Sequence, residues 1–309
     1  MPPKNRSIRS LRDRILPAIF AGLAFFSGSA LVIHAADAAR LDSSLPAVAS
    51  VELSNHLHQL RAKVPAGFTI VWQTPFFVIG DESAATVRSR ATNTVKWAVD
   101  LLKRDFFSRD PASTIDIWLF KDKASYEKHT RQVFHDTADS PFGYYSPQHR
   151  ALLMNISTGG GTLVHEIVHP FMASNFSACP PWYNEGLASL YEASIEDKGH
   201  IRGMVNWRLK GLEKAIQEKR VLAFEKLMAL DEPEFYGGNS GYSEHYAQAR
   251  YLCYYLQERE LLVRFHHEFV ANAKRDPTGV QTLKKVLKVD DLESFRQKWQ
   301  EFILKIRHP

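Results

Sequence analysis

Apolar positions along the chain follow two different periods, and the change comes near residue 180. Before it, short runs rich in β-branched and aromatic residues alternate with segments in which apolar residues recur at helical spacing. After it, nearly every apolar pattern has helical spacing. This arrangement predicts an α+β fold, in which an N-terminal mixed sheet with helices is followed by a mainly α-helical C-terminal part.

The first half contains four short stretches that predict strands. Residues 68–79 predict two strand segments broken at Pro75, and residues 115–120 predict a buried strand. Residues 142–146 and 151–156 flank a polar turn, which predicts a hairpin whose first strand lies at an edge of the sheet. Helical spacing predicts helices at 51–64, 85–107 and 123–133 in this half, and at 183–193, 205–218, 224–229, 244–260, 261–274, 279–286 and 292–306 in the second.

The N-terminal segment has the layout of a secretory signal peptide. Basic residues precede an apolar run at 15–33, and Ala36-Asp37-Ala38 then supplies a small-residue cleavage pattern. Glycine and serine inside the run favour cleavage and release into the periplasm or the medium. An uncleaved membrane anchor is the alternative, because the run is just long enough to span a bilayer. The predicted organisation is a signal segment at 1–38, a lead-in at 39–66, an α/β part at 67–175 and a helical part at 176–309.

Charge and cysteine content give little indication of a partner. The formal net charge is +5, but residues 1–38 hold five basic and two acidic residues, so most of the excess belongs to the signal segment. We therefore expect no nucleic-acid partner, and a membrane contact only through an uncleaved N-terminal segment. The two cysteines, Cys179 and Cys253, are compatible both with a disulfide and with two buried thiols.

The candidate chemistry is concentrated in His165-Glu166-Ile167-Val168-His169, which lies in an apolar stretch expected to form a buried helix. Residues four apart project from the same face of a helix, so both imidazoles can reach one metal ion, and Glu166 lies beside it. A further acid, Glu185, follows His169 after fifteen residues, which leaves room for a turn and a second, facing helix. His/His/Glu is a known ligand set of catalytic zinc sites, whereas Glu185 alone could equally be an acid near a helix N-terminus.

These segments resemble a known family. HEIVH followed by WYNEGLASLYE, residues 182–192, is similar to the gluzincin metallopeptidases, and most similar to bacterial peptidase-MA-like proteins with a short spacer between the two motifs. The resemblance implies a zincin-like fold, Zn²⁺ as the cofactor, His165, His169 and Glu185 as its ligands, and Glu166 as the general base. It is specific across residues 143–256.

The chain departs from the family pattern beside both motifs. Pro170 directly follows the second histidine and predicts that the helix kinks or ends there. Some branches have an acid four residues after the glutamate ligand, and it orients a ligand histidine; this chain has Ser189 at that position. Asn184 and Glu192 are the candidate substitutes.

A later tyrosine agrees with the pattern. Tyr246 matches the residue that stabilises the oxyanion in the aminopeptidase branch, where it opens a comparable helix. A tyrosine packed in the core is the alternative interpretation. Tyr242 and His245 are neighbours that could take the same role, so the sequence leaves the choice open among the three.

The resemblance implies an exported zinc-dependent peptidase in which Glu166 activates a metal-bound water for attack on a peptide bond. The substrate would be a peptide or protein, paired in extended form along the strand at residues 142–146. Two alternatives stay open: an inactive zinc-binding scaffold or binding protein of the cell envelope, and a metallohydrolase of a non-peptide amide. Retention of Glu166 favours the enzyme, because a purely structural zinc site needs no base.

Overall fold

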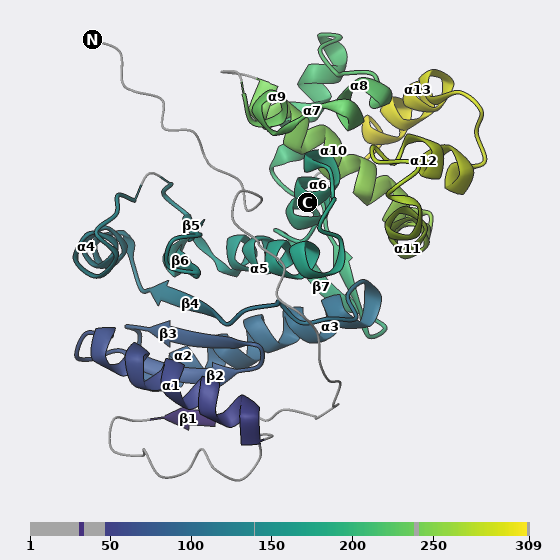
Figure 1. Ribbon diagram of the computed structural model, residues 1–309. Helices are drawn as coiled ribbons and strands as arrows, with labels where there is room; N and C mark the ends of the chain where they lie inside the picture. Colours follow the sequence, from purple (N-terminus) through teal and green to yellow (C-terminus); the bar gives the residue numbers. More distant parts are fainter. Residues whose placement is uncertain (1–30, 34–46, 139, 238–240, 308–309) are drawn as a thin grey trace.

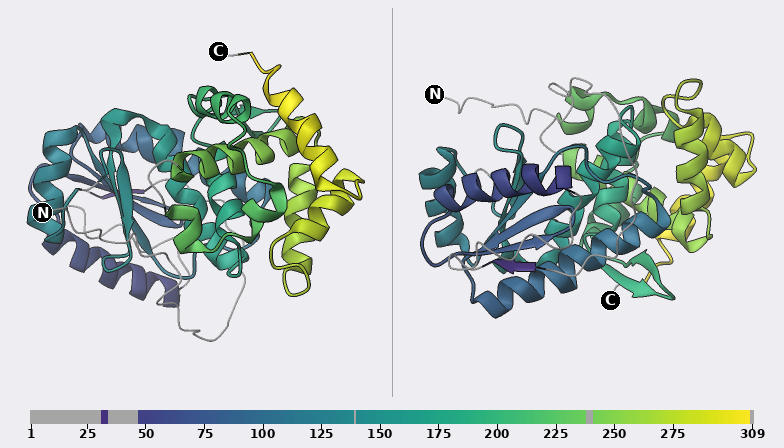
Figure 2. Two further views of the ribbon diagram at one scale, coloured as in Figure 1. Left: turned by 90° about the horizontal axis from the view of Figure 1, so that it is seen from above. Right: turned by 60° about the horizontal axis from the view of Figure 1, so that its bottom comes forward.

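A mixed sheet with its covering helices forms one side of the molecule, and the C-terminal helices form the other (Figure 1 and Figure 2). The computed structural model describes residues 31–33, 47–138, 140–237 and 241–307. The α+β class and the mixed N-terminal sheet predicted from the sequence are confirmed.

Among the described residues, six strands form the main sheet in the order β1-β2-β3-β4-β6-β5. Strands β3, β4 and β6 run parallel to one another, whereas β1, β2 and β5 run antiparallel to their neighbours. Strand β5 is an edge strand and forms a hairpin with β6, as predicted. The strands are β1 (Leu31–Ile33), β2 (Thr69–Gln73), β3 (Phe76–Gly80), β4 (Ile115–Phe120), β5 (Gly143–Ser146) and β6 (Ala151–Asn155).

The central strands are buried on both faces, and alternate residues enter two separate cores. In β4, Trp118 and Phe120 pack in a smaller core with residues of α1 (Ala47–Lys63) and α4 (Lys123–Phe134). Ile117 and Leu119 point to the opposite face and join the larger core. That core continues through the helix bearing the HEIVH motif into the C-terminal helices, so the motif lies where the sheet meets them.

Two helices carry the candidate ligands. Helix α5 (Gly160–Asn175) contains both histidines, and α6 (Pro181–Leu190) contains Glu185. Helix α10 (Gly241–Glu258) packs on α6 from the side away from α5 (Figure 1). The other helices are α2 (Ala84–Arg90), a π-helical segment (Ala91–Lys96), α3 (Trp97–Asp105), α7 (Arg208–Gln217), α8 (Phe224–Ala229), α9 (Glu232–Tyr236), α11 (Leu262–Asn272), α12 (Val280–Leu287) and α13 (Leu292–Ile303), with a 3-10 turn at Ile156–Thr158 before α5.

Of the two effects predicted for Pro170, a kink or an end of the helix, the end is wrong: α5 continues to Asn175. Proline removes one helical N–H donor, but the turn that follows it is buried through Phe171 and Met172, and this packing outweighs the lost bond. The side chain of Asn175 also donates to the Phe171 carbonyl and to the Arg109 carbonyl, at 2.8 Å each, which fastens the last turn.

The sequence did not predict two further elements. A small hairpin of β7 (Ser194–Asp197) and β8 (His200–Gly203) follows α6, and α9 is a helix of five residues. The hairpin turns at Lys198 and Gly199, both at positive φ, which is the conformation of a tight two-residue turn. Only Ile201 and Gly203 of its eight strand residues are buried, so the strands lack the apolar alternation by which a strand is predicted.

Most of the predicted signal segment and its cleavage pattern lie outside the described residues. Within that segment, Leu31–Ile33 form β1, which pairs with β2 at the edge of the sheet. None of the described helices is long and apolar enough to cross a bilayer. Cys179 and Cys253 are both buried, and neither forms a disulfide.

Candidate metal centre

Helix α5 presents His165 and His169 to the helix that follows it. The two residues lie one turn apart, and their ring centroids are separated by 4.9 Å. Glycine at position 161 allows close packing at the start of α5, because a Cβ there would overlap the Glu192 carbonyl oxygen. The first turn of α5 therefore lies directly against the backbone just beyond α6.

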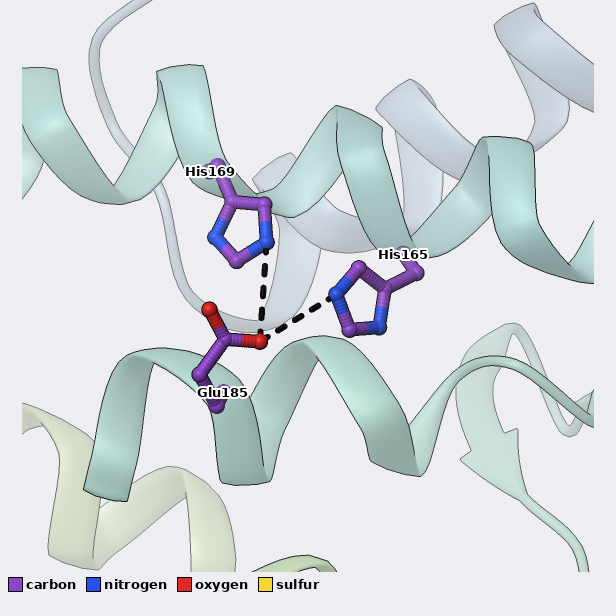
Figure 3. A group of neighbouring side chains, drawn as sticks. All are labelled: His165, His169 and Glu185. Atoms are coloured by element: carbon purple, nitrogen blue, oxygen red, sulfur yellow. Dashed lines mark ion pairs between the residues drawn. The ribbon is translucent and has the colours of Figure 1, made fainter. Parts of the chain in front are cut away.

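Glu185 projects from helix α6 toward the two histidines of α5 (Figure 3). Pro180 is extended and Pro181 occupies the first turn, a position in which proline favours helix initiation. Gly186 follows the glutamate because α10 passes close by: a Cβ there would stand 3.0 Å from the Ala249 carbonyl oxygen. In the Asn-Glu-Gly sequence, the glutamate is the candidate ligand and the glycine lets α6 and α10 pack closely.

The structure brings His165, His169 and Glu185 into one buried group. Glu185 Oε2 lies 3.3 Å from His165 Nε2 and 3.9 Å from His169 Nε2, and one ligand atom from each residue lies within 4.8 Å of the others. The three residues are 8 %, 8 % and 5 % exposed. A buried carboxylate facing two imidazoles needs a cation or protons to compensate its charge.

The chemistry of this group fits a metal ion. Glu185 Oε2 is buried and receives no hydrogen bond from the described residues, although it is the atom that faces both imidazoles. Ligand atoms about 2 Å from a tetrahedral zinc ion lie about 3.3 Å apart, which matches the distance from Glu185 to His165, while the other separations in the group are 3.9 Å and at most 4.8 Å. The three side chains could therefore hold a metal ion with little rearrangement.

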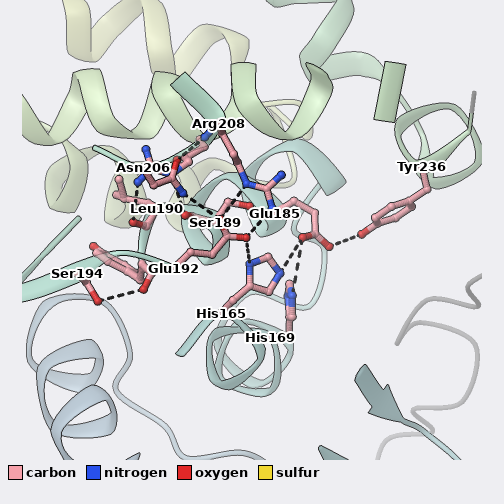
Figure 4. A network of polar contacts seen from close by, with 12 residues as sticks. His165, His169, Glu185, Ser189, Leu190, Glu192, Ser194, Asn206, Arg208 and Tyr236 are labelled. Atoms are coloured by element: carbon pink, nitrogen blue, oxygen red, sulfur yellow. Dashed lines mark hydrogen bonds and ion pairs between the residues drawn. The ribbon is translucent and has the colours of Figure 1, made fainter. Parts of the chain in front are cut away.

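Each histidine has a partner on its other ring nitrogen (Figure 4). His169 Nδ1 lies 3.0 Å from Asn184 Oδ1, and His165 Nδ1 lies 3.3 Å from Glu192 Oε1. At His169, the hydrogen bond to Asn184 holds the proton on Nδ1 and leaves Nε2 with a free lone pair for a metal. At His165, the contact with Glu192 is an ion pair without hydrogen-bond geometry. Asn184 and Glu192, the substitutes expected from the sequence, thus both lie beside a histidine ring nitrogen, and their role in orienting metal ligands stays a prediction.

Glu192 is itself held in place by two residues of the segment that follows the hairpin. Arg208 makes a bidentate pair with it, through Nη2 at 2.6 Å from Oε1 and Nε at 2.8 Å from Oε2. Asn206 Nδ2 donates to Oε2 at 3.1 Å. Burial raises the pKa of Glu192, but Arg208 and His165 outweigh burial and lower it to about 2, so the carboxylate stays ionised.

The same charges act on the candidate ligands. Burial lowers the pKa of His165, but Glu185 and Glu192 outweigh burial and raise it to about 10. Burial raises the pKa of Glu185, but His169, His165 and Tyr236 together lower it to about 2. The group therefore keeps an ionised carboxylate and strongly favours a positive charge between its members, supplied either by a proton or by a metal ion.

Tyr236, the last residue of α9, was not predicted as part of the site. Its hydroxyl donates to Glu185 Oε1 at 2.6 Å, across 51 positions of sequence. A signal for α9 exists in the chain, because Asp231 and Glu234 form a capping box and Pro233 stands in the first turn. That signal predicts a helix start but does not indicate which ligand its last residue reaches.

The other predicted site residues are placed as follows. Glu166 lies on α5 and is partly exposed. The ring of Tyr246 lies beside that of Tyr236, at 6.2 Å between centroids, and under the Arg208 guanidinium, at 5.3 Å. His245 Nδ1 lies 3.1 Å from the Phe235 carbonyl oxygen, while the side chain of Tyr242 lies outside the described residues.

No protein family matches the chain, and no curated protein matches it either. The fold and the site together define an α+β protein with a buried His/His/Glu group that could hold a metal ion.

Proposed function

We propose that the chain is an exported zinc-dependent metallopeptidase of the gluzincin type with a zincin-like fold. The observation that carries the proposal is the buried group of His165, His169 and Glu185, with Glu166 directly after the first histidine on the same helix. The ordered partners of both histidines support it, because a zinc site of this kind depends on such partners for ligand orientation.

In this proposal, each side chain has a separate task. His165, His169 and Glu185 hold the ion, which when bound supplies Lewis-acid chemistry for water and for a carbonyl group. Glu166 accepts a proton from the attacking water as the oxygen of that water bonds to the carbonyl carbon. Glu166 then returns this proton to the leaving amine as the carbon–nitrogen bond breaks. The role of Tyr246 in stabilising the oxyanion stays a prediction.

Strand β5 supports a peptide as the substrate. It is an edge strand, it lies against α5, and its outer side pairs with no other strand among the described residues. An extended peptide can pair with such an edge through its main chain. Exposed Phe142, directly before the strand, would then be available to contact the substrate.

The layout of the N-terminal segment supports the location. Its basic start, apolar run and small-residue exit favour export to the periplasm or the medium, with membrane anchoring as the alternative. The mass of the exported protein distinguishes a cleaved signal peptide from an anchor.

The first test combines metal analysis with peptide digestion. We expect about one zinc ion per chain, and cleavage of a peptide library that a chelator abolishes and added zinc restores. Glu166→Gln should retain the zinc and lose cleavage by at least about 100-fold, because it removes the base but not the ligands. Glu301→Gln, an exposed change on α13, should leave cleavage unchanged.

Each result separates the proposal from its alternatives. A protein without bound zinc, although both histidines are intact, would contradict the metal centre. Zinc binding without cleavage of any peptide would leave a scaffold or binding protein, and chelator-sensitive hydrolysis of simple amides alone would indicate a non-peptide substrate.

A further inference from the structure

We propose that Tyr236 is a positioning residue, which holds the Glu185 carboxylate so that only Oε2 binds the metal. The inference rests on the proposed metal centre and deepens it. It assigns a role to a residue on α9 that the sequence motif does not contain.

The two oxygens of Glu185 have different surroundings. The hydroxyl of Tyr236 donates to Oε1 at 2.6 Å, whereas Oε2 receives no hydrogen bond from the described residues and faces both imidazoles. A carboxylate with both oxygens equally free can turn and bind a metal through either or both. A strong donor on Oε1 fixes the rotation of the group and keeps Oε1 away from the ion.

The partners of all three ligands match them chemically. The imidazole N–H groups of His165 and His169 need acceptors, and they face Glu192 and Asn184. The carboxylate of Glu185 needs a donor, and it receives Tyr236. Three ligands with three complementary partners form a shell in which the metal-facing atom of each side chain is determined in advance.

Tyr236 is held by its own neighbours, so its hydroxyl does not depend on the metal for its position. A capping box of Asp231 and Glu234 begins α9, and Phe235 is fully buried. The ring of Tyr236 lies 5.5 Å from that of Phe235 and 6.2 Å from that of Tyr246.

Tyr246 packs between Tyr236 and Arg208, the residue that holds Glu192 beside His165. Its ring lies beneath the Arg208 guanidinium at 5.3 Å, and Arg208 holds Glu192 against His165 (Figure 4). Packing therefore links the donor to Glu185 with the acceptor for His165. The hydroxyl that donates to the Glu185 carboxylate is that of Tyr236.

The test measures metal binding and its geometry, not peptidase activity. In Tyr236→Phe, which removes only the hydroxyl, we expect zinc affinity, measured against a chromogenic chelator, to fall by about ten-fold. The visible spectrum of the cobalt-substituted variant should be weaker than that of the wild type, as Glu185 binds through both oxygens and the coordination number rises. Tyr255→Phe, whose ring packs on Phe295 and Phe302 far from the ligands, should change neither reading.

A double mutant shows whether Tyr236 acts through Glu185. In the Glu185→Gln background, Tyr236→Phe should weaken zinc binding by less than about two-fold, because the group that it positions is no longer a carboxylate. Unchanged affinity and cobalt spectrum in Tyr236→Phe would overturn the positioning role, and so would an equal loss in both backgrounds. Tight zinc binding without peptide cleavage would instead contradict the proposed function and leave this inference standing.

Discussion

At the two histidines, the neighbouring residues determine which nitrogen is available to a metal. Asn184 Oδ1 lies at hydrogen-bond distance from His169 Nδ1 and so holds the proton on that atom. Neutral imidazole has one donor and one acceptor, so Nε2 becomes the acceptor that faces Glu185. Replacing Asn184 therefore tests whether His169 needs this hydrogen bond to present Nε2 to a metal ion.

We predict that Asn184→Leu weakens zinc binding by about 10- to 100-fold, because His169 loses the acceptor that fixes its tautomer. Asn184→Asp is the matched control: it keeps an acceptor oxygen at the same place and should bind zinc at least as tightly as the wild type. Competition with a chelator measures both constants. Equal affinity of the Leu variant and the wild type would show that the ring needs no such partner.

At the scale of elements, the site depends on three helices that approach one another closely. Helix α6 lies between α5 and α10, and Gly186 is the contact point with α10. A Cβ at Gly186 would stand 3.0 Å from the Ala249 carbonyl oxygen and 3.1 Å from Cys253 Sγ, and helix backbone cannot yield as a flexible side chain can. The residue after the candidate ligand thus sets the spacing of the helices.

We predict that Gly186→Ala costs about 1–3 kcal/mol of unfolding free energy, because it overpacks the contact of α6 with α10. Gly211→Ala on α7 is the matched control, since nothing lies within 4 Å of its added Cβ. That change should stabilise the protein by about 0.5–1 kcal/mol through lower backbone entropy in the unfolded chain. Denaturant unfolding compares the two. A Gly186→Ala variant as stable as Gly211→Ala would contradict the packing argument.

The elements differ in how well the local sequence predicts them. The sheet hairpin, α5 and α6 follow from apolar period and turn residues, which act over a few positions. The end of α5 does not, because burial of Phe171 and Met172 outweighs the local effect of Pro170. Helix α9 and the hairpin of β7 and β8 are short and largely exposed, so their apolar pattern is too weak to predict them.

At the scale of the whole molecule, the candidate site also contains residues that the local sequence predicts and residues that it does not. His165, Glu166 and His169 share one helical turn, and Glu185 belongs to the next helix, so motif and spacing were enough to predict the group. Tyr236 and Arg208 reach the site from later elements: Tyr236 follows Glu185 by 51 positions, and Arg208 follows Glu192 by 16. No local pattern encodes such contacts, because they follow from how the helices pack.

A further buried histidine, outside the candidate metal group, lies where the two sides of the molecule meet. His266 of α11 is 1 % exposed and packs on the rings of Phe106 and Phe107, which follow α3. The hydroxyl of Tyr183, on α6, lies 3.1 Å from its Nδ1. Burial chiefly, and then the neighbouring His267, lower the pKa of His266 to about 3.

This shift makes the whole fold sensitive to acid. In the unfolded chain His266 takes up a proton below its ordinary pKa of about 6.5, whereas the native state stays neutral until about pH 3. The unfolded state therefore binds more protons in this window, and stability falls as the pH falls, by at most about 1.4 kcal/mol per pH unit from this residue.

We predict that His266→Gln, which keeps a hydrogen-bonding partner for Tyr183, unfolds more easily at pH 7 but loses less stability between pH 6.5 and 4. Denaturant unfolding at several pH values measures the slope of unfolding free energy against pH for the wild type and for the variant. Excess chelator keeps both proteins free of metal. His58→Gln on the exposed face of α1 should keep the wild-type slope, and an unchanged slope in His266→Gln would show that His266 does not contribute to the acid sensitivity.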